Sequence, residues 1–242
     1  MAESSSITGE VAPAAARAGP LERALLGLGA LFEDTRPWER VSGREAACLV
    51  LCIAGAAALR FWQLGAVGLH GDEDLMALAT LHVVRHGTPL LPSGMFYSRG
   101  IAQIYLMAGS VLAFGHSEWA LRLPSALCGV VLVPLAYLAG RRFLARPWNL
   151  AFTAAVALLP AFIADAQTAR MYVFMVASIA AFVALVFAWE RTSRLGYLVA
   201  AVVVLVLGIQ FYQLAIFATF LVLYPGLVRG EPRKLLLGAL AF

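Results

Sequence analysis

The sequence LHGDEDLMALATLHVVRHGTPLLPSGMFYSRG, from Leu69 to Gly100, interrupts a chain that otherwise consists almost entirely of apolar segments. It contains three consecutive acids, Asp72, Glu73 and Asp74, and most of the four histidines of the chain. Charged and titratable side chains are costly near a bilayer, so a cluster of them indicates a functional site by default. We interpret the remainder of the sequence as the frame that holds this cluster at one membrane face.

The composition decides the class of protein. Hydrophobic residues make up 62% of the 242-residue chain, and charged residues only 13%. A soluble domain cannot bury that much apolar surface, so the sequence predicts an all-α, polytopic membrane protein. The net charge of +4 suits loops that face anionic lipid, and no basic stretch with interleaved aromatic residues suggests nucleic-acid binding. The 3 cysteines fall in apolar stretches and predict neither disulfides nor a zinc site.

Two regions are expected. Residues 1–44 have no basic region ahead of an apolar core, so we expect a disordered cytoplasmic tail rather than a signal peptide. Residues 45–242 form the transmembrane module, in which 65–118 is one outer loop. The last apolar run begins at Leu235 and is too short to cross a bilayer. We therefore expect the chain to be the N-terminal piece of a longer protein.

Apolar runs predict the membrane spans at Ala46–Leu64, Trp119–Gly140, Pro147–Ala164, Met171–Trp189 and Leu195–Val228. The last run would be about 50 Å long as one helix, against a hydrocarbon core of about 30 Å. Gly208, Gln210 and Gln213 mark a turn, so this run is divided into two short spans. Arg60, near the end of the first span, is expected to snorkel to the interface.

Two short helices are predicted in the outer loop. Asp72–Arg85 carries an apolar stripe between Gly71 and Gly87, and Ile101–Phe114 is almost wholly apolar. Basic residues should lie on the cytoplasmic side, and they do so together only if Ile101–Phe114 does not cross the bilayer. The loops concerned are at 141–146, 191–194 and 229–234. Both short helices are therefore expected to lie along the membrane interface.

This topology gathers polar residues at the outer face, namely Asp72, Glu73, Asp74, Glu118, Asp165, Arg99, Arg122, Arg170 and all four histidines. A plain membrane anchor would not sort its charges in this way. The triple acid could serve only as the cap and first turn of a helix, where the helix dipole favours negative charge. Three adjacent carboxylates exceed what a cap requires, which favours a reactive site.

Four stretches carry a resemblance: LHGDEDLMALA at 69–79, YSRG at 97–100, FGHSEWALRLPSALCG at 114–129 and LLPAFIADAQTARMY at 158–172. They resemble the GT-C superfamily of membrane glycosyltransferases, and most of all its branch of protein O-mannosyltransferases and lipid A aminoarabinose transferases. The acidic pair combined with Arg-Leu-Pro-Ser is fairly specific, whereas either motif alone is weak. The resemblance implies transfer of a sugar, with inversion, from a polyprenyl-phosphate donor to an acceptor at the outer face.

The resemblance also implies roles for individual residues. Asp72 matches the catalytic acid/base position of the family, and Glu73 is its catalytic neighbour. Candidate donor-phosphate ligands are Arg122, Arg170 and Arg99, and candidate substrate-lining residues are Tyr97, Tyr172, Asp165 and His70. Asp74 is an extra acid, and Asp165 stands where relatives often carry tyrosine or serine. The chemistry agrees, because the reaction needs a carboxylate for the proton of the acceptor and cations for the leaving phosphate.

Several alternatives stay open at this point. No cofactor is certain, but Glu73, Asp74 and Asp165 could hold a divalent metal ion, and His82 with His86 could form a metal pair. The expected partners are the polyprenyl-phosphate sugar, membrane lipids and a glycan, lipid or protein acceptor, at the plasma (inner) membrane. The protein could instead be a transporter or channel, or a non-catalytic membrane subunit. A transporter should carry ionisable residues or broken helices at the bilayer midplane, where this chain is nearly all apolar.

Overall fold

The computed structural model describes residues 41–223 and 232–240, which belong to one compact unit. The elements are α2 (Gly43–Phe61), α3 (Asp72–His86), α4 (Ile101–Phe114), α5 (Glu118–Gly140), α6 (Arg146–Leu158), α7 (Pro160–Ala166), α8 (Tyr172–Thr192), α9 (Leu195–Phe211), the 3-10 helix η2 (Gln213–Val222) and α11 (Pro232–Leu240). The predicted all-α fold class is confirmed. The predicted tail lies outside the described residues as far as residue 40.

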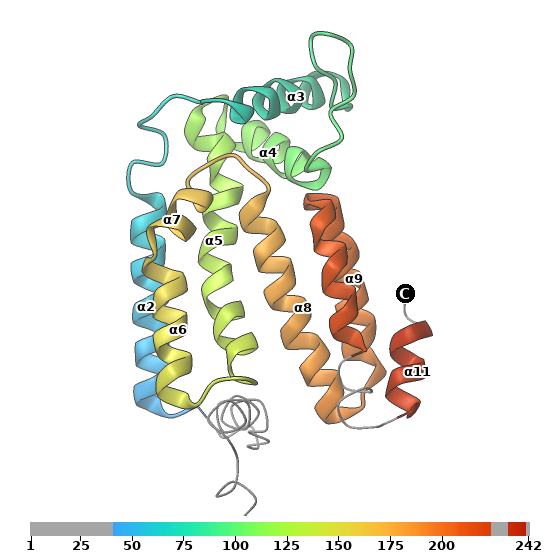
Figure 1. Ribbon diagram of the computed structural model, residues 1–242. Coiled ribbons are helices and arrows are strands. Elements are labelled where there is room, and N and C mark those ends of the chain that lie inside the picture. Colours follow the sequence, from blue (N-terminus) through green and yellow to red (C-terminus); the bar gives the residue numbers. More distant parts are fainter. Residues whose placement is uncertain (1–40, 224–231, 241–242) are drawn as a thin grey trace, which may run out of the picture. The chain divides into compact units, whose positions relative to one another are not determined.

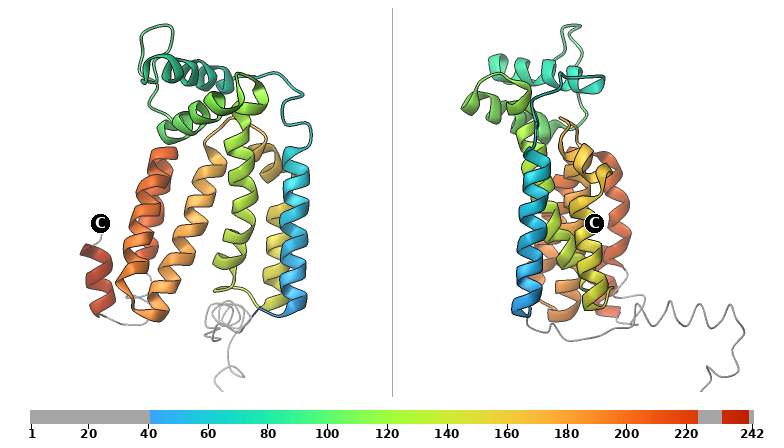
Figure 2. Two further views of the ribbon diagram at one scale, coloured as in Figure 1. Left: turned by 180° about the vertical axis from the view of Figure 1, so that it is seen from behind. Right: turned by 90° about the vertical axis from the view of Figure 1, so that its left-hand side faces the viewer.

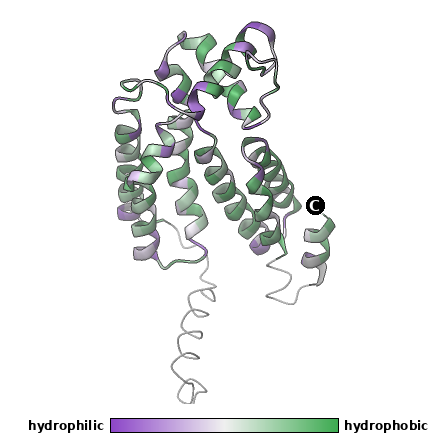
Figure 3. Cartoon of the chain, turned by 45° about the horizontal axis from the view of Figure 1, so that its top comes forward, coloured by the Kyte–Doolittle hydropathy of each residue, from purple (hydrophilic) through white to green (hydrophobic). Residues whose placement is uncertain are grey.

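Helices α3 and α4 lie across one end of the longer helices α2, α5, α6, α8 and α9 (Figures 1 and 2). Their bounds agree with the two short helices predicted in the outer loop, to within one residue. Hydropathy follows the same division, with apolar residues along the long helices and hydrophilic ones towards their ends (Figure 3). Helix α4 does not run beside the long helices, which is the arrangement that the charge pattern required.

Within the described residues, α5 and α8 are long and apolar enough to cross a membrane by themselves, and α6 with α7 forms a third such segment if that bent pair is one span. The run Pro147–Ala164, predicted as a single span, forms this bent pair, in which α6 and α7 meet at an angle of 50°. The cause is Pro160, which has no N–H and so leaves the carbonyl of Val156 without its helical donor. The predicted division of the last apolar run is found at Tyr212, whose backbone is extended between α9 and η2.

Arg60 of α2 binds the free carbonyl groups at the break between α6 and α7, and it does so inside the helical bundle. Its guanidinium donates hydrogen bonds to the carbonyls of Ala157 at 2.8 Å and Val156 at 3.0 Å. Pro160 and the bend leave these carbonyls without partners, and a cation at the end of a helix is also favoured by the helix dipole. The side chain is fully buried. The expectation that Arg60 snorkels to the interface was therefore wrong, because the proline break offers it acceptors inside the bundle.

A separate apolar cluster fixes the α3–α4 layer to the long helices. Its members include Met76 of α3, Ile104 and Met107 of α4, Leu121 of α5 and Met171 before α8. Each of these side chains is at most 4% exposed, and burying one stabilises the fold by roughly 1.5–3 kcal/mol. The layer is thus anchored on the first turns of α5 and α8, which carry the candidate site residues.

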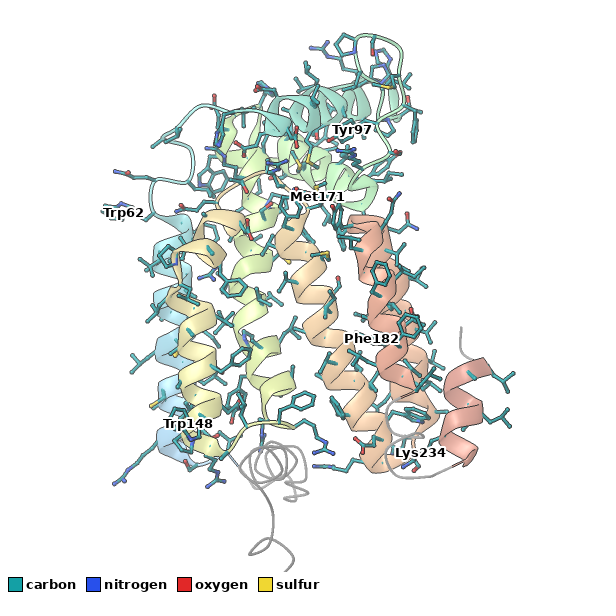
Figure 4. All side chains as sticks on the ribbon, in the orientation of Figure 1. Trp62, Tyr97, Trp148, Met171, Phe182 and Lys234 are labelled. Carbon is teal, nitrogen blue, oxygen red and sulfur yellow. The ribbon has the colours of Figure 1, made fainter. Side chains whose placement is uncertain are left out.

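The end of the molecule opposite α3 carries the basic loops. Glu45 accepts a hydrogen bond from Tyr137 at 2.6 Å and lies 3.7 Å from Arg146. At the end of α8, Glu190 lies 3.5 Å from Arg142, and its carbonyl accepts from Lys234 at 2.7 Å. Figure 4 shows Trp148 and Lys234 at this end, and Tyr97 and Met171 at the other. The described basic loops therefore share one end, as the charge pattern predicted.

Candidate active site

The triple acid forms the first turn of α3. Gly71 precedes it with φ 61°, a conformation that L side chains rarely adopt, and no side-chain cap forms a hydrogen bond there. Successive helical residues point about 100° apart, so the three carboxylates diverge. Glu73 belongs to the buried face that also contains Met76, Ala77 and Thr80, whereas Asp72 and Asp74 are exposed.

Glu73 makes a two-point ion pair with Arg122 of α5. Arg122 donates from Nε to Oε1 at 3.1 Å and from a terminal nitrogen to Oε2 at 2.9 Å. The backbone N–H of Ala169 also donates to Oε1 at 2.6 Å, and Nδ1 of His70 lies 3.2 Å from Oε2. Both members of the pair are buried, Glu73 at 0% and Arg122 at 3% exposure. This carboxylate therefore joins α3, α5 and the connection between α7 and α8.

The remaining donors of Arg122 are also used. They reach the carbonyls of Leu64 at 3.2 Å, Val67 at 2.6 Å and Gly68 at 3.1 Å. A guanidinium has five N–H donors, and with the two bonds to Glu73 each of them has an acceptor. Arg122 was predicted to bind the donor phosphate, but in this arrangement it has no donor left for one.

The same contacts set the ionisation of Glu73. Burial raises the pKa of its carboxyl, but the hydrogen bonds from Arg122 and Ala169 and the charge of Arg122 outweigh burial. The net result is a pKa below the ordinary value of a glutamic acid. Glu73 is thus held as a buried anion, which suits a structural ion pair better than proton exchange with a substrate.

Asp72 has a different environment. Its Oδ2 accepts a hydrogen bond from Arg170, which follows α7. The side chain of Asp72 is 51% exposed, and that of Arg170 is 28% exposed. The Nε of Arg170 is buried and has no hydrogen-bond partner among the described residues. This pair is accessible and retains hydrogen-bonding capacity, in contrast to Glu73 and Arg122.

Aromatic side chains lie near the Asp72–Arg170 pair. The guanidinium of Arg170 lies 5.2 Å from the ring centroid of Tyr172, and Tyr172 meets Tyr212 edge to face at 5.7 Å. The pKa of the half-buried Tyr97 is raised by burial and by the charge of Asp72, while Arg170 acts in the opposite direction. The charges of Asp72 and Arg170 are thus close enough to Tyr97 to affect its ionisation.

A close approach of backbone brings Tyr97 to this position. Gly100 has φ 63°, and a Cβ there would lie 3.3 Å from the side chain of Met171 and 3.4 Å from that of Met76. The loop before α4 can therefore pack directly against the start of α8. Among the sequence predictions, Tyr97, Tyr172, Arg170 and Asp72 are brought together.

The other predicted site residues make fewer contacts with this group. Arg99 is exposed, and its positive charge acts on the hydroxyl of Tyr97. Asp165 in α7 interacts electrostatically with Arg170. His70 contacts Glu73, and Asp74 points to solvent with no side-chain partner in the described part of the chain.

The candidate metal ligands do not fit a metal site. The described residues contain no group of three His, Cys, Asp or Glu side chains placed to hold an ion. Both oxygens of Glu73 are already occupied by cationic or N–H donors, so it cannot join Asp74 and Asp165 around a cation. The rings of His82 and His86 lie 4.5 Å apart, but His82 uses Nδ1 on the carbonyl of Thr88 at 2.6 Å.

Sequence reasoning did not single out Tyr212. The signal that could have found it is its place in the predicted turn, between Gln210 and Gln213, in an otherwise apolar run. Sequence reasoning also assigned Arg122 to substrate binding and did not pair it with Glu73. Glu73 shares the helical spacing of the buried residues of α3. That spacing becomes decisive once the buried face of α3 is known, and it pairs a buried acid with a buried cation.

Fold and site together define a helical membrane protein that holds a carboxylate and an arginine, framed by tyrosines, at one end of its bundle. Residues 98–239, more than half of the chain, match the dolichyl-phosphate-mannose-protein mannosyltransferase family. The chain belongs to this family and is thus a membrane glycosyltransferase of the GT-C type. The match begins after Asp72 and Glu73. No curated protein and no solved structure matches the chain.

Proposed function

We propose that the protein transfers a sugar from a polyprenyl-phosphate donor to a glycan, lipid or protein acceptor, with inversion, and that Asp72 is the base. The observation that carries this proposal is the Asp72–Arg170 pair, an exposed carboxylate beside a partly exposed guanidinium. One group can receive a proton and the other can bind a phosphate. The family match supports sugar transfer in general.

The reaction is a single displacement. Asp72 takes the proton of the acceptor hydroxyl or amine as the heteroatom attacks the anomeric carbon of the sugar. The bond between that carbon and the phosphate oxygen breaks, and the phosphate leaves with the electron pair. Attack opposite the leaving group inverts the configuration. Arg170 stabilises the negative charge that develops on the phosphate, where a planar guanidinium binds well.

The same guanidinium couples donor binding to the release of the base. Arg170 is hydrogen-bonded to Asp72, so a phosphate that binds Arg170 competes with this carboxylate. As the contact weakens, the carboxylate of Asp72 loses its hydrogen bond from Arg170 and is free to accept one from the acceptor hydroxyl or amine. The base is thus freed when a donor is bound, which limits unproductive proton transfer.

Glu73 and Arg122 act as positioning residues in this proposal. Their ion pair holds the loop at 64–68 and the start of α3, and Glu73 binds the N–H of Ala169, the residue before Arg170. Both halves of the Asp72–Arg170 pair are therefore set by one buried contact. We place this end of the molecule at the outer face of the plasma membrane, because the basic loops occupy the opposite end.

The broken helix is the feature that a transporter would share. Helices α6 and α7 are bent by 50°, and a buried arginine stands beside the break. Discontinuous helices in transporters offer their free backbone groups to a substrate or ion. Here Arg60 already binds the carbonyls of Val156 and Ala157. The break thus serves the fold, and sugar transfer is the better supported function.

The test is the substitution Asp72→Asn in protein reconstituted in liposomes, with polyprenyl-phosphate mannose as donor and a panel of glycan, lipid and peptide acceptors. Loss of a general base typically lowers the rate by about 10²–10⁴-fold. We expect this loss in turnover, while binding of the donor stays within about threefold, since the amide has nearly the shape of the carboxylate.

Asp74→Asn is the matched control, because Asp74 is an exposed acid in the same helical turn. Its turnover should stay close to that of the wild type. The proposal fails if Asp72→Asn keeps most of its turnover, or if the wild-type protein transfers no sugar to any acceptor in the panel.

A further inference from the structure

The side-chain amide of Gln167 joins the connection between α7 and α8 to the end of α2. Its Nε2 donates hydrogen bonds to the carbonyls of Leu59 at 2.9 Å and Trp62 at 3.0 Å. The last carbonyls of a helix have no donor within that helix, and beyond Trp62 the backbone turns away through Gln63, whose φ is 52°. One amide group therefore uses both of its N–H donors to close the end of a helix that lies 105 to 108 residues earlier in the sequence.

Arg60 and Gln167 link the same two parts of the chain in opposite directions. Arg60 of α2 donates to the carbonyls that precede the break between α6 and α7, and Gln167 donates to carbonyls of α2 on either side of Arg60. Helix α7 lies beside α2 (Figure 1). Gly129 of α5 leaves room for this crossing, since a Cβ there would lie 2.5 Å from Cβ of Ala166 and 2.8 Å from Nε of Arg60. Helix α7 is thus fixed to α2 at both of its ends.

The connection at residues 167–171 carries Arg170 and is held on each side of it. The N–H of Ala169 donates to Glu73 at 2.6 Å, and Met171 is 4% exposed within the apolar cluster under α3 and α4. Gln167 supplies the contact to α2. The guanidinium of Arg170 is partly exposed, so its position depends on where these contacts place its backbone.

The side chain of Gln167 is not needed to end α7. The backbone N–H of Gln167 already closes that helix, because it donates to the carbonyls of Ile163 at 2.9 Å and Ala164 at 3.1 Å. The side chain is half-buried, where a hydrogen bond adds little to the stability of the whole fold. What its two bonds do determine is the distance between the end of α2 and the backbone that leads to Arg170.

We propose that Gln167 is a positioning residue for the transfer reaction, which acts by holding Arg170 where negative charge develops on the leaving phosphate. This inference rests on the proposed function and adds a residue that touches neither donor nor acceptor. A displacement of about 1 Å in a group that stabilises the transition state can lower the rate by about 10²-fold. The end of α2 thus serves as the fixed point from which the arginine is placed.

The experiment compares two substitutions in liposomes with polyprenyl-phosphate mannose as donor. Gln167→Met keeps the length of the side chain and removes both N–H donors, whereas Gln167→Lys keeps donors for the two carbonyls. With Gln167→Met, kcat per folded protein should fall by about 10–100-fold. KM for the donor should rise by less than about threefold, because the lost interaction is made mainly in the transition state. Gln167→Lys should restore kcat to within about threefold of the wild type.

Two further variants distinguish positioning from a general structural effect. Gln210→Met is the matched control, since Gln210 is an exposed glutamine near the end of α9, and it should leave kcat unchanged. In an Arg170→Gln background, Gln167→Met should lower kcat by less than about twofold further, because a residue that acts through Arg170 has no effect without it. The inference is overturned if Gln167→Met keeps the wild-type kcat, if its effect is equal in both backgrounds, or if Gln167→Lys does not restore activity.

Hydrogen–deuterium exchange tests the contact without relying on activity. In Gln167→Met, the amides of residues 167–171 should exchange about tenfold faster than in the wild type or Gln167→Lys, while the interiors of α5 and α8 stay unchanged. This measurement also decides the question if Arg170→Gln is inactive, since unchanged exchange would overturn the inference. If the wild type transfers no sugar, the proposed function fails even when exchange follows this pattern. If transfer depends on Asp72 but Gln167→Met changes neither kcat nor exchange, the reaction stands and the positioning role does not.

Discussion

Asp72 and Glu73 are neighbours in the sequence, and each pairs with an arginine, yet the two pairs differ in almost every physical respect. Glu73 and Arg122 are buried, and each donor and acceptor between them is in use. Asp72 and Arg170 are accessible, and Arg170 keeps an unpaired Nε. One turn of α3 thus contributes to a buried ion pair on its inner face and to an exposed ion pair on its outer face.

The difference teaches that residue type and spacing do not decide the role of an acid in such a site. Removing one partner of a buried ion pair leaves an uncompensated charge in an apolar environment, which is strongly destabilising. An exposed pair contributes little stability, because water and salt screen its attraction. The exposed pair can therefore change partners during a reaction, and the buried pair cannot.

The largest expected effect on stability is that of Glu73→Gln. This substitution leaves the guanidinium of Arg122 buried without its counter-charge, so the free energy of unfolding in mild detergent should fall by about 3–5 kcal/mol. Asp72→Asn, one residue away, should change it by less than about 1 kcal/mol. Unfolding followed by circular dichroism measures both. Equal losses in the two variants would contradict the division between the pairs.

Acidification should remove the contribution of the Glu73–Arg122 pair to the free energy of unfolding. The pKa of Glu73 is lower in the folded protein than in the unfolded chain, so its stabilising effect is fully present above the ordinary value of about 4.3. It is lost as the pH falls through the lower, folded pKa. The difference in unfolding free energy between the wild type and Glu73→Gln should therefore shrink on acidification below pH about 4. A difference that stays constant to the lowest accessible pH would contradict this assignment.

The smallest expected effect on stability is that of the exposed Asp72–Arg170 pair. A double-mutant cycle with Asp72→Asn and Arg170→Gln should give a coupling energy in unfolding below about 1 kcal/mol. It should decrease further with added salt, because exposed charges are screened. A coupling of several kcal/mol, insensitive to salt, would show that this pair is also structural, and that it is not free to exchange a carboxylate for a phosphate.

Much of the fold could be predicted from the sequence because it depends on local signals. Gly71 and Gly87 bound α3, and the turn residues near Gln210 locate the break between α9 and η2. The basic loops predicted a common direction for the long helices, and on that ground α4 was expected to lie outside the spans. These features follow from backbone conformation and charge, which do not require knowledge of tertiary contacts.

The different environments of Asp72 and Glu73 could not be predicted from such local signals. Which of two adjacent acids faces inward depends on the rotation of α3 about its axis, and packing of Met76 against α4 and α8 sets that rotation. Arg60 was missed for a similar reason, since its acceptors become available only when Pro160 breaks a helix about a hundred residues later. The apposition of Tyr212 and Tyr172 is likewise a long-range contact.

The buried position of Arg60 has a consequence for how the protein is made. Its carbonyl acceptors lie 96 and 97 residues further along the chain, so they do not yet exist when α2 leaves the ribosome. During synthesis the guanidinium must stay hydrated at the bilayer surface, with α2 shallow or held by the insertion machinery. Only after α6 has been inserted can α2 reach its final depth. The final seating of α2 is thus completed by the arrival of α6, the third of the long helices, through the contacts of Arg60.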